Sequence, residues 1–140
     1  MMPLDNKVFV DTSFFIALMN SRDADHAMAV KFQQQLSLQA TQKITSDYIL
    51  LELCDGLAKL HYREFAIQLI GLLQQDQSFE IIPASSEITQ AAWELFKARS
   101  DKEWGLTDCT SFVIMQKLKI NQALTADNHF KQAGFNALLL

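Results

Sequence analysis

The sequence predicts a single α/β domain whose central, mostly parallel sheet is flanked by helices. Short, β-prone apolar runs alternate with longer segments of helical periodicity, and this alternation is typical of parallel strands joined by helical crossovers. The chain has 140 residues, of which 49% are hydrophobic, with two prolines and four glycines. A chain of this size and composition can bury one substantial core, and no internal repeat or linker divides residues 1–140.

Each element has a local pattern that supports it. In the first half of the chain, a short apolar run ends at Asp11, and Thr12 and Ser13 are candidate caps for the helix that follows. Ser46 is a candidate N-cap of the same kind. The predicted elements are strand 7–10, helices 14–20 and 25–39, strand 43–45, and helices 47–60 and 62–75.

The second half of the chain continues the alternation. Ser85 or Ser86 opens a helix, a turn at Trp104 and Gly105 leads into the next one, and Phe130 lies in a short helix. The predicted elements are strand 79–83, a helix to about residue 99, a helix from 107 to about 119, strand 123–125 and a final apolar strand 135–140.

The composition and the N-terminal sequence restrict the cellular compartment and the classes of partner that we expect. No apolar run approaches the roughly 20 residues needed to cross a bilayer, and Asp11 interrupts an N-terminus that lacks a small-residue cleavage site. We therefore expect a cytoplasmic protein with no membrane partner, in which Cys54 and Cys109 are reduced and buried; a disulfide or a reactive thiol is the alternative. The net charge of −4 does not favour nucleic acid, but bound cations would invert the local charge.

Four acids follow predicted strands or lie on the adjoining helices. Ligand sites in sheets of this kind lie at the carboxyl ends of the strands. Asp11 directly follows the first strand, Asp127 follows a late one, and Asp108 lies in the first turn of a helix. Glu52 interrupts the apolar run 48–54, where a carboxylate without a partner is costly. We therefore expect the four side chains near one edge of the sheet.

Each acid also has a simpler structural explanation. Asp11, Asp108 and Asp127 are suited to capping helices or to complementing a helix dipole. Glu52 could face solvent or pair with Lys59. These alternatives stay open. If the four carboxylates do converge, their mutual repulsion requires a cation.

The residue types favour Mg²⁺ or Mn²⁺ over zinc. Carboxylates are the hard oxygen ligands that these two ions prefer, whereas the clustered cysteines and histidines typical of zinc sites are lacking. His26, His61 and His129 are spread along the chain, and each is expected to be an ordinary surface or packed residue. His129 is the one worth a test, because it lies two residues after Asp127.

Four sequence blocks, in series, resemble the PIN-domain nucleases. They are VDTSFFIAL around Asp11, ILLELCDGL around Glu52, WGLTDCTSFVIM around Asp108 and ALTADNHF around Asp127. The resemblance covers nearly the whole chain and is greatest to the small bacterial members, which include the VapC-type toxins of toxin–antitoxin pairs. It implies that these four acids are catalytic and bind Mg²⁺ or Mn²⁺. Hydroxyls that support the acids or contact substrate are assigned to the following residues: Thr12, Ser13 and Thr125.

The same resemblance implies a function and its partners. The expected activity is a divalent-metal-dependent endoribonuclease that hydrolyses RNA to 5′-phosphate and 3′-hydroxyl ends, acts as a toxin, dimerises and binds a small antitoxin. The alternatives are a PIN domain in RNA processing, a non-catalytic binding module of the same fold, and a phosphoacceptor domain, for which the expected lysine after a late strand is missing. Candidate phosphate contacts are the following cations: Lys7, Lys43, Lys97, Arg99, Lys102 and Lys131.

Overall fold

A computed structural model describes residues 3–140 and contains one sheet of five strands, all parallel, in the order β3-β2-β1-β4-β5. Seven helices complete this part of the chain. The expected α/β architecture with a parallel central sheet is confirmed. The elements in chain order are β1 (Lys7–Val10), α1 (Thr12–Met19), α2 (His26–Gln39), β2 (Gln42–Ser46), α3 (Asp47–Gly56), α4 (Leu60–Gln75), β3 (Phe79–Ile82), α5 (Ser86–Ala98), α6 (Leu106–Lys117), β4 (Gln122–Leu124), α7 (Asn128–Gln132) and β5 (Asn136–Ala137).

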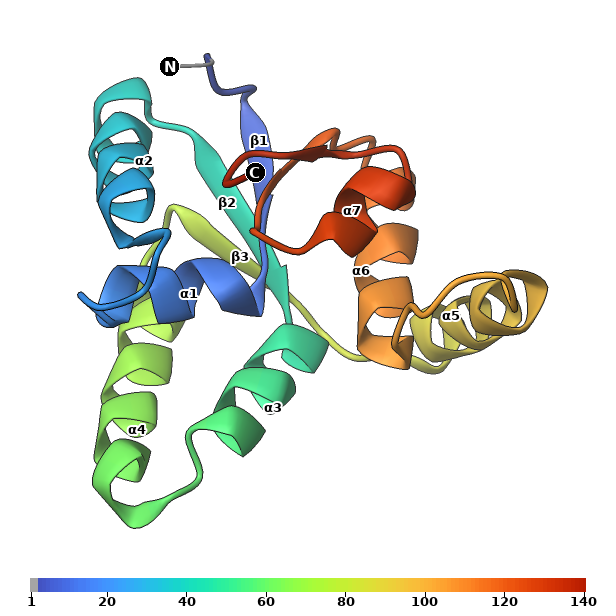
Figure 1. The fold of residues 1–140 in the computed structure, drawn as a ribbon, viewed down its shortest axis with the longest axis horizontal. Helices are drawn as coiled ribbons and strands as arrows, with labels where there is room; N and C mark the ends of the chain where they lie inside the picture. The colour runs from blue at the N-terminus through green and yellow to red at the C-terminus, as the bar shows by residue number, and fades with distance from the viewer. Residues whose placement is uncertain (1–2) are drawn as a thin grey trace.

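The strand order reverses direction at β1. From β1 the chain crosses to β2 and then β3 on one side of the sheet, and it later returns to β4 and β5 on the other side. Figure 1 shows α1, α2 and α4 to the left of the strands and α5, α6 and α7 to the right. The carboxyl ends of β1 and β2 point down in this view, toward the starts of α1 and α3. A reversal of this kind leaves a crevice beyond the carboxyl ends of the strands beside it, here β1 and β4.

Helix capping was predicted correctly at two serines and wrongly at the first helix. The Ser46 and Ser85 hydroxyls accept hydrogen bonds from the amides of Ile49 and Ile88, at 3.2 and 3.1 Å. In α1, by contrast, the N-cap position is Asp11, and its side chain makes no capping bond. Thr12 and Ser13 lie inside the first turn, so their hydroxyls are available to partners outside the helix.

Most predicted boundaries lie within two residues of those observed, and two differ by more. Helix α3 ends at Gly56 rather than near residue 60, and the Leu57 amide closes it by donating to the carbonyls of Leu53 and Cys54. A glycine destabilises a helix interior, so an early end there is unsurprising. The final apolar run forms a strand only over Asn136–Ala137. Its remaining residues are held by burial of Leu138 and Leu139 and by single bonds to β4 and Thr125.

Aromatic packing fixes α6 against α7. Phe112 of α6 meets Phe130 of α7 edge-on, with ring centroids 5.1 Å apart, and both side chains are fully buried. Trp104, which precedes α6, packs edge-on against Phe112 on another side. Close packing of large rings leaves little freedom in how the two helices are placed. The polar residues next to these rings, at the start of each helix, are therefore held in a defined arrangement.

The prediction of two reduced, buried cysteines is confirmed in full only for Cys109. Both cysteines are free, but Cys54 is only partly buried. Burial raises the pKa of the Cys109 thiol, which makes that thiol less reactive. None of the helices in residues 3–140 combines the length and apolarity needed to cross a membrane.

Candidate active site

Asp11 lies at the carboxyl end of β1 and is almost fully buried, with 6% of its surface exposed. Its amide donates to the Leu124 carbonyl, so the β1–β4 pairing extends up to this residue. The hydroxyls of Thr125 and Ser13 both donate to the same carboxylate oxygen, Oδ2, at 2.8 and 3.1 Å. Burial raises the pKa of Asp11 to about 6, although these hydroxyl bonds oppose the shift.

Thr125 and Ser13, which we call the hydroxyl pair, also bind the backbone that leads from β4 to Asp127. The Asp127 amide donates to Thr125 Oγ1 and the Ala126 amide donates to Ser13 Oγ, each at 3.0 Å. The hydroxyl pair therefore connects the carboxylate of the first acid to the main chain of the fourth. Thr125 is fully buried, and a buried hydroxyl with several partners is a rigid link.

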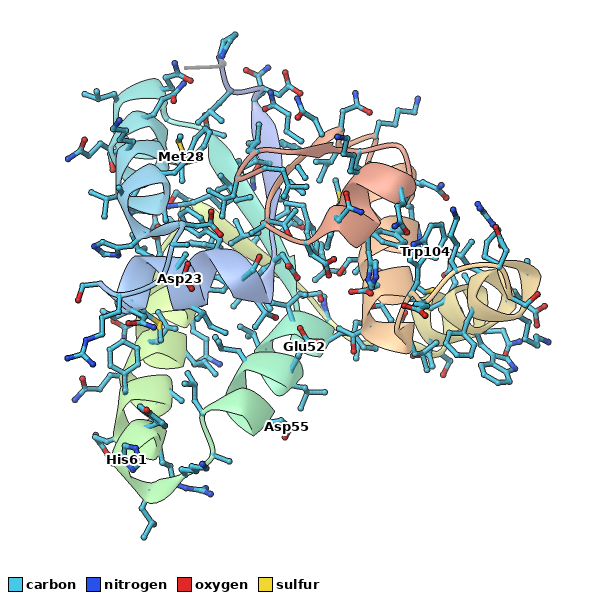
Figure 2. All side chains as sticks on the ribbon, viewed as in Figure 1. Asp23, Met28, Glu52, Asp55, His61 and Trp104 are labelled. Carbon is cyan, nitrogen blue, oxygen red and sulfur yellow. The ribbon has the colours of Figure 1, made fainter. Side chains whose placement is uncertain are left out.

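Glu52 lies on α3 with an exposed side chain, as one of its simpler explanations proposed. Its carboxylate accepts a hydrogen bond from Thr12 Oγ1 at 2.7 Å. The negative charge of Glu52 adds to the rise in the pKa of Asp11, which places the two carboxylates within electrostatic reach. Figure 2 shows Glu52 on the part of α3 nearer the sheet and Asp55 nearer its far end.

Asp108, Asp127 and His129 form what we call the outer cluster. His129 Nδ1 lies 2.9 Å from Asp108 Oδ2 and 3.5 Å from Asp127 Oδ1. The hydrogen bond to Asp108 raises the pKa of the imidazole, and the charge of Asp127 adds to the effect. The cluster is partly open to solvent, because the exposed fractions of the three side chains are 18%, 34% and 30%.

The capping explanations for two acids are also correct. Asp108 Oδ2 accepts from the Gly105 amide at 3.0 Å, and Asp127 Oδ1 accepts from the His129 amide at 2.9 Å. Each carboxylate therefore fixes a helix start and still presents oxygen to the outer cluster. A capping role and a ligand role are compatible here, because a carboxylate has about four acceptor positions.

The outer cluster has a donor set that could hold a metal ion. Its three residues each offer one ligand atom, and these atoms all lie within 4.8 Å of one another. It is the one group of this kind within residues 3–140, and Asp11 and Glu52 do not join it. Oxygen and imidazole donors suit first-row divalent ions, and oxygen alone suits Mg²⁺. That all four acids share ions stays a prediction.

Sequence reasoning missed His129 as a member of the site and misplaced one cation. The only sequence signal for His129 is its position two residues after Asp127. Lys43, a candidate phosphate contact, is buried: its ammonium lies 3.6 Å from Asp76 and over the Phe79 ring. Lys43 is thus engaged within the fold, and it is not available to a phosphate.

Comparison with known proteins identifies the family. A model of the PIN domain matches residues 8–136. The chain belongs to the PIN domain family. Among characterised PIN proteins it resembles the 23S rRNA-specific endonuclease VapC20 of Mycobacterium tuberculosis, with 28% identity over 128 residues, which are 91% of this chain and 95% of that protein.

Solved structures support the assignment to the PIN domain family. The crystal structure of VapC20, described as a toxin that cleaves the sarcin–ricin loop, matches this PIN domain with a TM-score of 0.78 over 91% of this chain and 95% of that one, at 28% identity. FitAcB from Neisseria gonorrhoeae matches with a TM-score of 0.64 at 19% identity, over 93% of this chain and 94% of that one. The second likeness concerns the fold alone.

Proposed function

We propose that this PIN domain is an endoribonuclease that requires a divalent cation, Mg²⁺ or Mn²⁺. The observation that carries the proposal is the presence of all four acids of the PIN pattern in a chain similar to an rRNA endonuclease over 91% of its length. Asp11 and Asp127 follow β1 and β4, the strands beside the reversal in strand order. Asp11, Glu52, Asp108 and Asp127 are then the catalytic and metal-binding residues. The hydroxyls of Thr12, Ser13 and Thr125 position them.

The carboxylates of the site need a positive partner before they can meet RNA, because they would repel the phosphodiester. A bound divalent ion supplies Lewis acidity, which lowers the pKa of water and offsets charge that develops on the phosphate. The chain itself supplies orientation. Asp11 is held by the hydroxyl pair, and Asp108 and Asp127 are held by the helix starts that they cap. Oxygens fixed before substrate arrives need no rearrangement during reaction.

Hydrolysis of this kind does not need the 2′-hydroxyl of the substrate as a nucleophile. We propose 5′-phosphate and 3′-hydroxyl ends as the products. The preference for RNA over DNA rests on the similarity to VapC20 and not on a group in the site. Whether the substrate is single-stranded or folded is therefore an experimental question, and a sarcin–ricin-type stem–loop is the first folded substrate to try.

We further propose that the chain folds as one domain, acts in the cytoplasm as the toxin of a toxin–antitoxin pair and forms a homodimer. Support for a protein partner comes from α4, which exposes several large apolar side chains: Leu60, Tyr62, Ile67 and Leu72. Ile67 also lines a groove of about 640 Å³ between α3 and α4. Exposed large apolar side chains on one helix are a feature of protein interfaces. Light scattering of the purified chain, alone and with its candidate antitoxin, tests both partners.

The deciding experiment is cleavage of end-labelled RNA. Substrates are an unstructured RNA, a 23S-type stem–loop and the matching DNA, each with Mg²⁺, Mn²⁺ or EDTA. We expect cleavage of RNA with either ion, none in EDTA, and a loss of at least about a hundredfold in Asp11→Asn and Asp108→Asn. Asp55→Asn, which changes an exposed acid on α3, is the matched control and should keep full activity.

Two results would contradict the proposal. Equal cleavage in EDTA and in Mg²⁺ would show that the reaction does not require a divalent cation. Equal activity in Asp11→Asn, Asp108→Asn and the control would show that these acids are not needed for catalysis. Melting curves of each variant confirm that a loss of activity is not a loss of fold.

A further inference from the structure

The imidazole of His129 lies among the acids without being one of the four residues that the sequence pattern marks. Its Nδ1 atom lies 2.9 Å from Asp108 Oδ2 and 3.5 Å from Asp127 Oδ1. An imidazole that faces two carboxylates can compensate their charge when protonated, and its neutral nitrogen can join them as a metal ligand. Its position calls for an explanation in terms of the site.

The core of the protein holds His129 in this position. Asp108 lies one helical turn before Phe112, and His129 directly precedes Phe130 in sequence. Because the rings of Phe112 and Phe130 pack edge-on in the core, the starts of α6 and α7 are brought face to face. The capping bonds of Asp108 and Asp127 then fix the two carboxylates around the imidazole.

The spacing of the three ligand atoms suits coordination of one ion. An octahedral cation with ligands about 2.1 Å away places neighbouring ligand atoms about 3 Å apart and opposite ones about 4 Å apart. The 2.9 Å separation of Nδ1 from Asp108 Oδ2 is that of neighbouring ligands, and its 3.5 Å separation from Asp127 Oδ1 lies between the neighbouring and opposite values. Each of the three residues offers a ligand atom within 4.8 Å of the other two. Only small adjustments would bring them onto a single ion.

We propose that His129 Nδ1 is a direct ligand of the catalytic cation and that this nitrogen makes the site bind Mn²⁺ more tightly than Mg²⁺. The proposal rests on the metal dependence of the proposed ribonuclease. Imidazole binds first-row transition ions well, whereas Mg²⁺ strongly prefers oxygen and retains its waters. In the metal-free protein the Nδ1–Asp108 contact is a hydrogen bond, and the hydrogen on Nδ1 leaves when the ion binds.

The test uses Mn²⁺ alone as the probe, bound to the full chain. Pulsed electron paramagnetic resonance detects the ¹⁴N coupling of an imidazole nitrogen bound directly to Mn²⁺. We expect that coupling in the wild type, its loss in His129→Ala and His129→Gln, and its retention in His61→Ala. His61 is the matched control, because it is exposed on α4 and its ring lies against that of Tyr62 at a tilt of 47°, outside the outer cluster.

Titration calorimetry gives a second readout. Loss of the imidazole should weaken Mn²⁺ binding by roughly tenfold to a hundredfold and Mg²⁺ binding by less than about threefold. Melting curves of His129→Gln, which keeps a polar side chain, check that the fold survives where His129→Ala might lose it.

Each outcome decides between the two proposals. A wild type that binds Mn²⁺ without ¹⁴N coupling, or variants whose affinity for both ions falls equally, would overturn the role of His129 and leave the ribonuclease intact. A wild type with ¹⁴N coupling that cleaves no RNA would support the ligand and overturn the proposed activity.

Discussion

Asp11 and the outer cluster hold negative charge by different means, although they follow or adjoin neighbouring strands of one sheet. Asp11 is 6% exposed and its partners are two neutral hydroxyls. Asp108 and Asp127 are 18% and 34% exposed and face an imidazole that can carry a positive charge. Asp11 is buried, its hydroxyl partners are neutral and the nearby charge of Glu52 is also negative. The outer cluster is open to solvent and contains an imidazole that can carry a positive charge.

The difference shows which negative charge is least compensated in the metal-free protein. Hydroxyl dipoles cannot cancel a buried charge, so the pKa of Asp11 rises to about 6. In the outer cluster the two acids hold the pKa of His129 above its ordinary value, which is the mark of a compensating pair. We infer that the metal-free protein is destabilised chiefly by ionised Asp11 and only weakly by the outer cluster.

The largest expected effect is therefore on Asp11. A carboxyl with a raised pKa contributes stability that is fully present below about pH 4 and is lost as the pH rises through about 6. A rise from 3.8 to about 6 corresponds to at most about 3 kcal/mol. In EDTA, Asp11→Asn should raise the free energy of unfolding by up to that amount at pH 8 and leave it nearly unchanged at pH 4. Urea unfolding at the two pH values measures this.

Two controls sharpen that result. Asp55→Asn should have no effect beyond about 0.5 kcal/mol at either pH, because Asp55 is exposed. Added Mn²⁺ at pH 8 should stabilise the wild type by mass action and Asp11→Asn much less. Equal stabilisation by Asp11→Asn at pH 4 and pH 8 would mean that the side chain, and not its charge, is responsible.

The second effect separates the hydroxyl pair from ordinary buried hydroxyls. Thr125→Val removes a donor to Asp11 and an acceptor for the Asp127 amide, and it should cost about 1–3 kcal/mol. Thr45→Val is a close control, because Thr45 is equally buried and donates only to the Val10 carbonyl. Both variants lose stability, but only Thr125→Val should weaken Mn²⁺ binding, by about tenfold or more.

Rescue decides whether Thr125 positions the acids. Thr125→Ser keeps the hydroxyl and should restore Mn²⁺ affinity to within about threefold of the wild type. If Thr45→Val and Thr125→Val shift the calorimetric Mn²⁺ affinity equally, the hydroxyl pair has only a structural role.

The sequence predicted most features that depend on local pattern, although the cap of α1 and the end of α3 were wrong. Strand 7–10 was predicted at its observed bounds. Ser46 was predicted as a cap, and the cap of α5 was narrowed to Ser85 or Ser86, because capping needs only a hydroxyl three residues before an amide. Asp11 was placed at a strand end by the same local logic. Such features are set by residues adjacent in the chain, so a single sequence contains the information.

Features that depend on packing between distant elements were missed. His129 meets Asp108 because two phenylalanines pack in the core, 18 residues apart in the chain, and no local pattern reports that contact. Thr12 and Ser13 were expected to cap α1, but the Thr12 hydroxyl donates to Glu52 on α3, and the Ser13 hydroxyl accepts from the distant Ala126 amide. Lys43 was predicted to be a surface cation, but in the fold it is buried on β2 beside Phe79. In each case the partner of the side chain is distant in sequence and comes close only in the folded protein.

The smallest expected effect concerns the outer cluster without metal. Because the pKa of His129 is raised by its hydrogen bond to Asp108, this residue contributes stability that is fully present below about pH 6.5 and is lost as the pH rises through its folded value. His129→Gln in EDTA should therefore lower the melting temperature at pH 6 and approach the wild type at pH 9. The effect is modest, since the contact is partly exposed and screened. Melting curves at the two pH values, with His61→Gln as control, measure it. If His129→Gln lowers the melting temperature as much at pH 9 as at pH 6, the imidazole stabilises the cluster by packing and not by its charge. Asp11 and the outer cluster would then differ only in how deeply they are buried.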